Sequence, residues 1–374
     1  MKLASSTRRD FFKALLAGVA IALLIGVALD VVLLYRPLLD VLSYLFTNPS
    51  LILIHPLFMV LIFPGLGFVG IVAVLAIWGE RKFAAKVQNR VGPLYAGALP
   101  GGILQPIADL LKLLFKEIII PKDSDRLVFV MAPVAAFLMG AAPVALVPYS
   151  PSYVIFDFPL SLLLFFVFTG FFPMVLLLAG WSSNNKFSFI GGLRALYQQA
   201  SYEIPMFLSA LSAVMLAKSF SLMDIAKAQT GVWFIVLAPI SAVVFFTAVL
   251  AELEKFPFEI PEAESEIVAG WMTEYSGMTY GLYWFGIYVK LVAFSGLFAV
   301  LFLGGWNGPL IPAPWWMIIK VGVVATLIIS TRAFFPRIRI DQLISAGWTK
   351  LIPLALFNIL ILVALQPWLV RLLS

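Results

Sequence analysis

Carboxylates are concentrated in residues 251–275, which read AELEKFPFEIPEAESEIVAGWMTEY. Seven of the chain's 19 acidic residues fall there, although 62% of the chain is hydrophobic and its formal net charge is +6. Glu262 and Glu266 are four residues apart, so on one helix their like charges would raise the pKa of at least one of them. A raised carboxyl pKa suits a proton carrier, and the interleaved apolar residues favour a packed segment over a solvated acidic loop.

Prolines set the expected local structure of this stretch. Pro257 and Pro261 interrupt regular structure after Glu252, which we expect to end a membrane span. Pro261 is expected to begin a short helix with Glu262 and Glu264 in its first turn, where the helix dipole favours negative charge.

Two further glutamates lie beside apolar runs. Glu80, within WGERKFAAKVQNRVGP, is expected at the membrane end of a helix beside Arg81, where an unpaired charge would be costly. Glu203 is expected to open a membrane span just ahead of Pro205. Its role is left open between a partner of the helix dipole and a member of a proton path.

A basic segment follows near the C-terminal end, where RAFFPRIRIDQL supplies Arg332, Arg337, Arg339 and Asp341. Retention by anionic lipid and contact with the acidic stretch are both compatible with this composition. The chain has no Cys and one His, His55, so it offers neither thiolates nor a histidine cluster for a metal. Neither G-x-x-x-x-G-K-[ST] nor a G-x-G-x-x-G between strand and helix is present, which argues against a nucleotide site.

The elements that position these residues must be membrane helices. Mean hydropathy is +1.04 and only 12% of residues are charged, which excludes an ordinary soluble domain. Apolar runs of about 20 residues favour an all-α bundle over a closed barrel. Nine spans are expected, near residues 14–35, 56–78, 127–148, 160–181, 204–220, 231–251, 278–303, 314–331 and 351–370.

Basic residues gather in the loops after the second, fourth, sixth and eighth expected spans, which predicts that these loops and the N-terminus are cytoplasmic. The segment STRRDFFKALL resembles a twin-arginine export signal, but a retained anchor is favoured because no small-residue cleavage site follows. We therefore expect residues 1–55 to form an extra helix and an outer loop, and residues 56–374 to form the main membrane domain. In residues 101–126, Gln105, Asp109, Lys112 and Lys116 form one polar stripe, which predicts an amphipathic interfacial helix.

Six segments of the chain resemble a known family. They are ERKFAAKVQNRVGP, LQPIADLLKLLFKE, NNKFSFIGGLRALYQQASYEIP, PFEIPEAESEIVAGWMTEYSGM, LFLGGW and FFPRIRIDQLISAGW. In this order they are similar to the quinone-junction membrane subunit of respiratory complex I, called the H subunit in bacteria. The resemblance covers roughly residues 56–370, and the family extends to archaeal and photosynthetic complexes and to membrane-bound hydrogenases.

The resemblance implies that quinone is the substrate and that the terminal iron–sulfur cluster belongs to a neighbouring subunit, so this chain would carry no metal, flavin or other redox centre. It implies a plasma-membrane location within a multi-subunit complex. Residues matching the family's quinone region are Glu80, Arg81, Gln88, Arg90 and Phe258, and Arg332 and Arg337 are assigned to the same region. Residues matching its proton-coupling glutamates are Glu203, Glu252, Glu262, Glu264, Glu266 and Glu274.

The chain departs from the family pattern at three places. It has nine expected helices where the family has eight. Glu254 and Lys255, followed by Phe256, stand where the family usually has Asn-Arg. Ile287-Tyr288 replaces a usual Glu-Tyr, which removes an intramembrane carboxylate, and Lys290 is expected to face the interior as a substitute ionisable group.

These observations predict a membrane subunit of a proton-pumping quinone oxidoreductase that forms the quinone channel and couples quinone reduction to proton translocation. The alternatives are a subunit of a quinone-independent, hydrogenase-type ion pump and a structural membrane anchor. An anchor is disfavoured because it has no need of clustered glutamates beside hydrocarbon.

Overall fold

The computed structural model describes residues 56–96, 101–309 and 311–373. Every regular element in these ranges is a helix, so the expected all-α bundle is confirmed. Seven helices in the described part of the chain are long and apolar enough to cross a membrane. The first expected span, residues 14–35, lies outside the described residues, and the expected total of nine remains a prediction.

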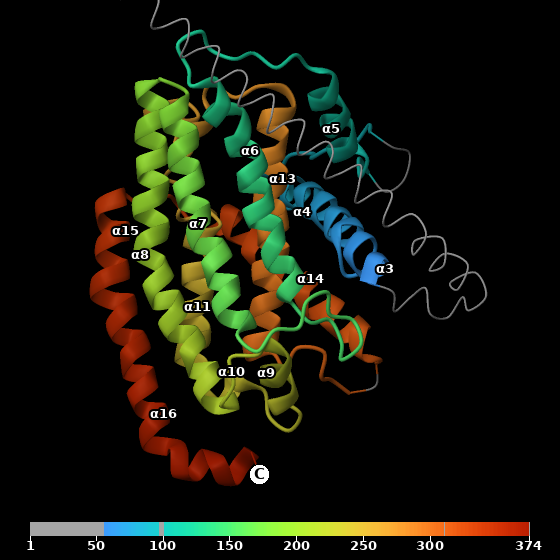
Figure 1. The fold of residues 1–374 in the computed structure, drawn as a ribbon, viewed down its shortest axis with the longest axis vertical. Helices are drawn as coiled ribbons and strands as arrows, with labels where there is room; N and C mark the ends of the chain where they lie inside the picture. Colours follow the sequence, from blue (N-terminus) through green and yellow to red (C-terminus); the bar gives the residue numbers. More distant parts are fainter. Residues whose placement is uncertain (1–55, 97–100, 310, 374) are drawn as a thin grey trace, which may run out of the picture. The chain divides into compact units, whose positions relative to one another are not determined.

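The long helices form the body of the bundle (Figure 1). They are α4 (Leu66–Val87), α6 (Arg126–Ala141), α7 (Ser161–Ser182), α8 (Lys186–Ala217), α11 (Pro239–Glu252), α13 (Gly277–Phe302), α14 (Ala313–Phe334) and α16 (Ile352–Leu373). Shorter elements connect or cover them. These are α3 (Pro56–Leu61), α5 (Gln105–Phe115), η1 (Ala142–Leu146), α9 (Leu222–Ala228), α10 (Phe234–Leu237), α12 (Glu264–Ile267), η2 (Gly270–Met272), α15 (Ile340–Ala346) and η3 (Gly347–Leu351).

Helix α13 forms the centre of the bundle. In its most apolar window 94% of residues are buried, against 17% in Ile340–Leu365, so α13 is surrounded by protein and the C-terminal helix lies at the periphery. Helices α4, α5, α6, α11 and α14 all pack against α13, whereas α16 runs along α8 (Figure 1). The backbones of α6 and α13 meet at glycines: a Cβ added to Gly140 would lie 2.8 Å from the carbonyl oxygen of Gly286. Such small-residue contacts are how membrane helices approach each other closely.

Several expected boundaries were wrong in ways that change the site. Helix α8 begins 18 residues before the expected position 204, because Asn185 caps it by accepting a hydrogen bond from the Phe187 amide and because several polar side chains of its first half, such as Gln198, are packed inside. Glu203 and Pro205 therefore lie in the middle of α8 and not at its start. Helix α4 continues to Val87, so Glu80 is inside a helix. The expected span 231–251 is broken before Pro239, leaving α10 and a 14-residue α11.

Candidate functional site

The acidic segment, residues 252–274, connects α11 to α13 and folds into the bundle. Glu254 adopts a left-handed backbone conformation, with φ of 53°, which turns the chain sharply after the helix. The side chain of Gln198, in α8, then donates hydrogen bonds from Nε2 to the carbonyls of Ala251 and Phe258, at 2.7 and 2.8 Å. This buried amide holds both ends of the turn, so the segment is packed, as the interleaved apolar residues predicted.

The short helix expected at Pro261 is not formed. Helix α12 starts at Glu264 and has only four residues, with Glu262 in the turn before it. Glu262 and Glu266 consequently do not share a helical face. The backbone prefers the turn because the first residues of the segment are fixed by tertiary contacts, which a local propensity argument does not include.

Glu80 is the centre of a buried charge cluster. Its Oε2 accepts hydrogen bonds from Lys255 Nζ at 2.9 Å and from the Tyr288 hydroxyl at 2.8 Å, and its Oε1 accepts one from Arg332 at 2.8 Å. The Glu80 side chain is 2% exposed, so the two cations offset the cost of burying its charge. Lys255 also lies over the Tyr288 ring, 4.5 Å from its centroid. Although burial opposes it, the Glu80 carboxylate holds the pKa of Lys255 above its usual range.

A cavity of about 280 Å³ opens beside this cluster, between α4, α5, α13 and α14. Its polar lining includes Glu80, Arg332 and Tyr288 on one side and Arg81, Asp109 and Lys112 toward α5. Its apolar wall includes Trp284 and Leu113. Arg332 is 43% exposed, so part of its guanidinium remains available to a molecule in the cavity while another part is held by Glu80. The cavity therefore suits a ligand that has an apolar body and a polar acceptor group.

A second buried pair lies deeper in the bundle. Lys290, on α13, donates from Nζ to Glu252 Oε1 at 2.7 Å, and the two side chains are 1% and 2% exposed. The ammonium also lies 3.9 Å from the centroid of the Phe172 ring. Lys290 thus faces the interior, as expected, and does not extend to lipid.

Glu203 joins this pair from α8. Its carboxylate occupies the space left by the missing side chain of Gly170 in α7. A Cβ added to Gly170 would lie only 2.5 Å from Glu203 Oε1. The charges of Glu252 and Lys290 both act on Glu203. Helices α7, α8, α11 and α13 therefore bring together the buried Glu252–Lys290 pair and the half-buried Glu203, although the expected position of Glu203 at a helix start was wrong.

Glu254 and Glu262 connect the two clusters electrostatically. Glu254 is 6% exposed; its Oε1 accepts a hydrogen bond from Gln199 at 2.9 Å, while its Oε2 has no hydrogen-bond partner in the described structure. Burial raises the pKa of Glu254, although the charge of Lys290 opposes the rise. Partial burial and the charges of Glu254 and Glu259 raise the pKa of Glu262.

The pKa of Glu266 is shifted in the opposite direction to the pKa values of Glu254 and Glu262. Glu266 is 48% exposed and accepts hydrogen bonds from Arg194 and from Arg337, each at 2.6 Å. The hydrogen bond and charge of Arg194, together with the charge of Arg337, hold the pKa of Glu266 below its usual range. The expectation that Glu262 and Glu266 titrate as a pair was therefore wrong, because Glu266 faces two arginines at the surface. Arg337 meets the acidic segment there and does not line the cavity beside Glu80.

The remaining candidates occupy separate places. Glu274 accepts a hydrogen bond from Asn185 at 2.6 Å at the start of α8, and the side chain of Glu264 is outside what the structure describes. Arg81 pairs with Asp109 of α5 and thereby joins α4 to this short helix beside the cavity.

Gln88 and Arg90 hydrogen-bond to each other at the exposed end of α4, at 2.7 Å. Phe258 is buried against Tyr202, with ring centroids 5.3 Å apart, and does not line the cavity. Within the described ranges, no group of three or more His, Asp or Glu side chains is arranged to hold a metal ion.

Four residues of the site were not singled out as site residues from the sequence: Lys255, Tyr288, Gln199 and Glu254. Lys255 and Glu254 were noted as departures from the family pattern, which was the available signal. Tyr288 was noted beside Ile287, but its hydroxyl reaches a residue 208 positions away. No local pattern predicts such a contact.

The fold and the site define a polytopic helical membrane protein whose core holds a connected set of buried charges next to an amphipathic cavity. A sequence model of the NADH dehydrogenase family matches residues 58–363. An H subunit of NADH-quinone oxidoreductase from Syntrophobacter fumaroxidans is 42% identical over 307 residues, covering 80% of this chain and 92% of that protein. The H subunit of Dehalococcoides mccartyi is 44% identical, covering 79% and 83%, and that of Geobacillus kaustophilus is 41% identical, covering 82% and 95%. The chain belongs to the NADH dehydrogenase family that contains the H subunits of NADH-quinone oxidoreductases.

Proposed function

We propose that this chain is one of the membrane subunits of a proton-pumping NADH-quinone oxidoreductase, and that quinone binds in the cavity beside Glu80. The observation that carries the proposal is the composition of this cavity, which combines an apolar wall with polar side chains that include Glu80, Arg332 and Tyr288. A quinone has an apolar body and two carbonyl acceptors, so the wall suits its ring and tail and Arg332 suits a carbonyl oxygen.

Reduction of a quinone to a quinol consumes two electrons and two protons. The electrons come from the iron–sulfur cluster of a partner subunit, and the cavity supplies orientation and electrostatics. The negative charge that develops on the quinone oxygens is stabilised by Arg332, which already compensates Glu80. Any movement of Arg332 toward the substrate weakens its pairing with Glu80, so the charge balance of the buried cluster responds to quinone chemistry.

The coupling route runs from this cluster to the core. Lys255 links Glu80 electrostatically to Glu262, Glu262 to Glu254, and Glu254 to the Glu252–Lys290 pair. When one of several groups coupled in this way changes its charge, the proton affinities of the others change with it. A structural anchor does not account for this arrangement, because buried charges cost free energy that apolar side chains of similar volume would not, and an anchor has no use for them.

In the same proposal, residues 56–374 form the active membrane domain in the plasma membrane, the N-terminus is cytoplasmic, and soluble and membrane partner subunits complete the complex. The relatives are named as H subunits of NADH-quinone oxidoreductases, which supports both the quinone and the membership of a complex.

A photoreactive azido-quinone tests the proposed cavity in the purified complex. We expect it to label peptides of α4, α5, α13 or α14, which surround the cavity, and an excess of unlabelled quinone should prevent the labelling. Labelling confined to other helices or subunits would contradict this location.

In proteoliposomes, Glu262→Gln should reduce proton pumping, whereas Glu117→Gln, which removes an exposed carboxylate beyond α5, should pump like the parent.

A further inference from the structure

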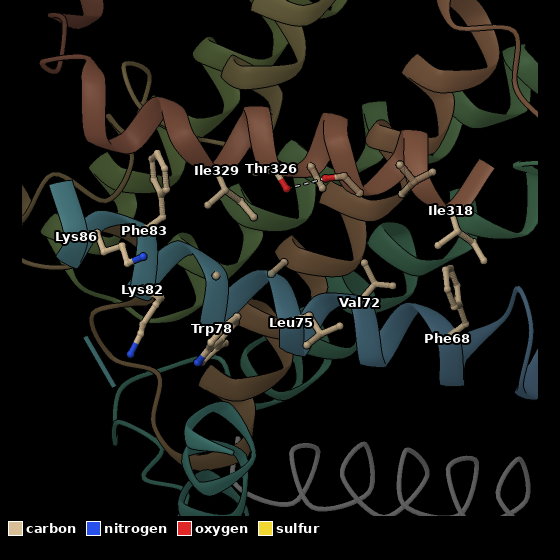
Figure 2. Close-up of a pocket in the computed structure, with 15 residues that line it drawn as sticks. Phe68, Val72, Leu75, Trp78, Lys82, Phe83, Lys86, Ile318, Thr326 and Ile329 are labelled. Carbon is tan, nitrogen blue, oxygen red and sulfur yellow. Dashed lines mark hydrogen bonds between the residues drawn. The ribbon is translucent and has the colours of Figure 1, made fainter. Parts of the chain in front are cut away.

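A second hollow, separate from the cavity beside Glu80, runs between α4 and α14 (Figure 2). Its volume is about 490 Å³, which lies within the range of ligand-binding pockets, about 300–1,000 Å³. Both helices are long and apolar enough to cross a membrane. We call this hollow the α4–α14 groove, and it lies at the depth of the bilayer.

Hydrocarbon side chains form most of the groove. Phe68 and Val72 of α4 face Ile318 and neighbouring residues of α14 (Figure 2). Thr326 is one of the few polar residues of the wall, and its hydroxyl already donates a hydrogen bond to the Gly322 carbonyl at 2.7 Å. The wall therefore suits an alkyl chain better than a ligand that needs directional hydrogen bonds.

The groove is open because two glycines leave space in its wall. A Cβ added to Gly79 or to Gly322 would meet no atom within 4 Å. Glycines between membrane helices usually allow the helices to close on each other, as Gly140 and Gly286 do in this bundle. At Gly79 and Gly322 the helices do not close, so the volume is available to a ligand.

One end of the groove is positively charged. Lys82 and Lys86 lie there, in the last turns of α4 (Figure 2). Lys82 donates hydrogen bonds from Nζ to the carbonyls of Pro93 and Gly101, at 3.0 and 3.3 Å, so its ammonium is held by the chain beyond α4 and Lys86 is the cation that can meet a ligand. Lys86 makes no ion pair with any residue that the structure describes, and no acidic residue lines the groove. A lysine near the end of a membrane helix places its ammonium at the headgroup level.

The long apolar wall of the groove and the positive charge at its end together indicate which kind of ligand it binds. The 18-residue separation of Phe68 and Lys86 corresponds to about 27 Å of helix, which exceeds the depth of one leaflet, about 15 Å. We propose that the α4–α14 groove binds an anionic phospholipid, with one acyl chain along the apolar wall and the phosphate against Lys86. A quinone carbonyl could accept a hydrogen bond from Lys86 but carries no charge to compensate the ammonium, whereas a phosphate does both.

Lipid retention by the intact complex tests the acyl-chain part of the proposal. The complex is purified in detergent, washed, and supplied with limiting phosphatidylglycerol, and the lipid bound per complex is measured by mass spectrometry. Gly322→Phe places a ring in the groove and should lower retention about tenfold, whereas Gly322→Ala, for which there is room, should retain lipid like the parent. Equal retention in the parent and Gly322→Phe would overturn the proposal.

The headgroup part has its own test. Lys86→Ala should lower retention of phosphatidylglycerol about tenfold and leave phosphatidylcholine unchanged, and Lys116→Ala, an exposed lysine beyond α5, serves as the matched control. A photoreactive benzoylphenylalanine at Ile318 should cross-link to phospholipid. Cross-linking to another subunit or to quinone would show a different occupant and overturn the proposal.

Discussion

The ammonium of Lys290 lies 2.7 Å from Oε1 of Glu252 and 3.2 Å from the backbone carbonyl of the same residue. The pair joins α13 to the last residue of α11 in the most deeply buried part of the bundle. Since neither side chain reaches water, each charge depends on the other for compensation.

Breaking this pair should be costly. We expect Lys290→Met to lower the stability of the protein by about 3–5 kcal/mol, because Glu252 is left as an uncompensated buried charge. Thermal unfolding of the purified complex measures the effect. Lys227→Met, which removes a cation from the exposed pair with Asp224, is the control and should change stability by about 1 kcal/mol or less.

The double variant Lys290→Met/Glu252→Leu separates stability from function. Replacing both charges with apolar groups should restore most of the lost stability, since no charge is left without its partner. If the pair belongs to the coupling route, this variant should still reduce quinone but pump few protons. Normal pumping by a stable double variant would show that the pair is only structural.

The hydrogen bond from Tyr288 should affect the electrostatics of the charge cluster around Glu80. Tyr288→Phe removes one hydrogen bond to a carboxylate, an interaction of about 1.5–3 kcal/mol, and leaves Lys255 and Arg332 in place. We expect quinone-dependent electron transfer to fall by about tenfold while the complex stays assembled. Tyr280 lines the same cavity, so the electron-transfer rate of Tyr280→Phe provides the comparison. Equal rates in the parent and Tyr288→Phe would contradict a role of the cluster in quinone chemistry.

The sequence predicted the features that depend on composition and local pattern. Apolar runs indicated the membrane helices, the polar stripe indicated the short amphipathic helix α5, and the interleaved apolar residues indicated that the acidic segment is packed. The pairing of charges was not predictable, because Lys255 reaches Glu80 across 175 positions and the outcome depends on how α4 and the turn after α11 are rotated. Glu266 shows the same limit: its spacing from Glu262 indicated repulsion, whereas Arg194 and Arg337, 72 and 71 positions away, decide its environment.

The raised pKa of Glu262 predicts a pH-dependent stability. Below the ordinary carboxyl pKa of 4.5, Glu262 is protonated in both the folded and the unfolded protein and contributes nothing. As the pH rises above 4.5, the unfolded chain releases this proton while the folded protein keeps it, so the folded state is progressively destabilised. Glu262→Gln should therefore be no more stable than the parent at pH 4 and more stable at neutral pH. Unfolding midpoints across this range measure the difference.

Glu266 provides a comparison of opposite sign. Its pKa is lowered by Arg194 and Arg337, so its contribution to stability is present above the ordinary pKa of 4.5 and is lost as the pH falls through the lower folded value. Glu266→Gln should be less stable than the parent at neutral pH, by about 1 kcal/mol or less for each exposed pair, and should match the parent in strong acid. The same pH dependence in both glutamine variants would contradict the assignment of opposite environments.

Gly170 provides the space for the Glu203 carboxylate, and this can be tested without changing a charge. Gly170→Ala places a Cβ 2.5 Å from the position of Glu203 Oε1, so the carboxylate must move away from its place beside Glu252 and Lys290. We expect proton pumping in proteoliposomes to fall while quinone reduction continues, because the cavity beside Glu80 is untouched. Gly79→Ala adds the same methyl group where it meets no atom within 4 Å, so it should pump like the parent. If Gly170→Ala also pumped normally, Glu203 would be a packed carboxyl group outside the coupling route.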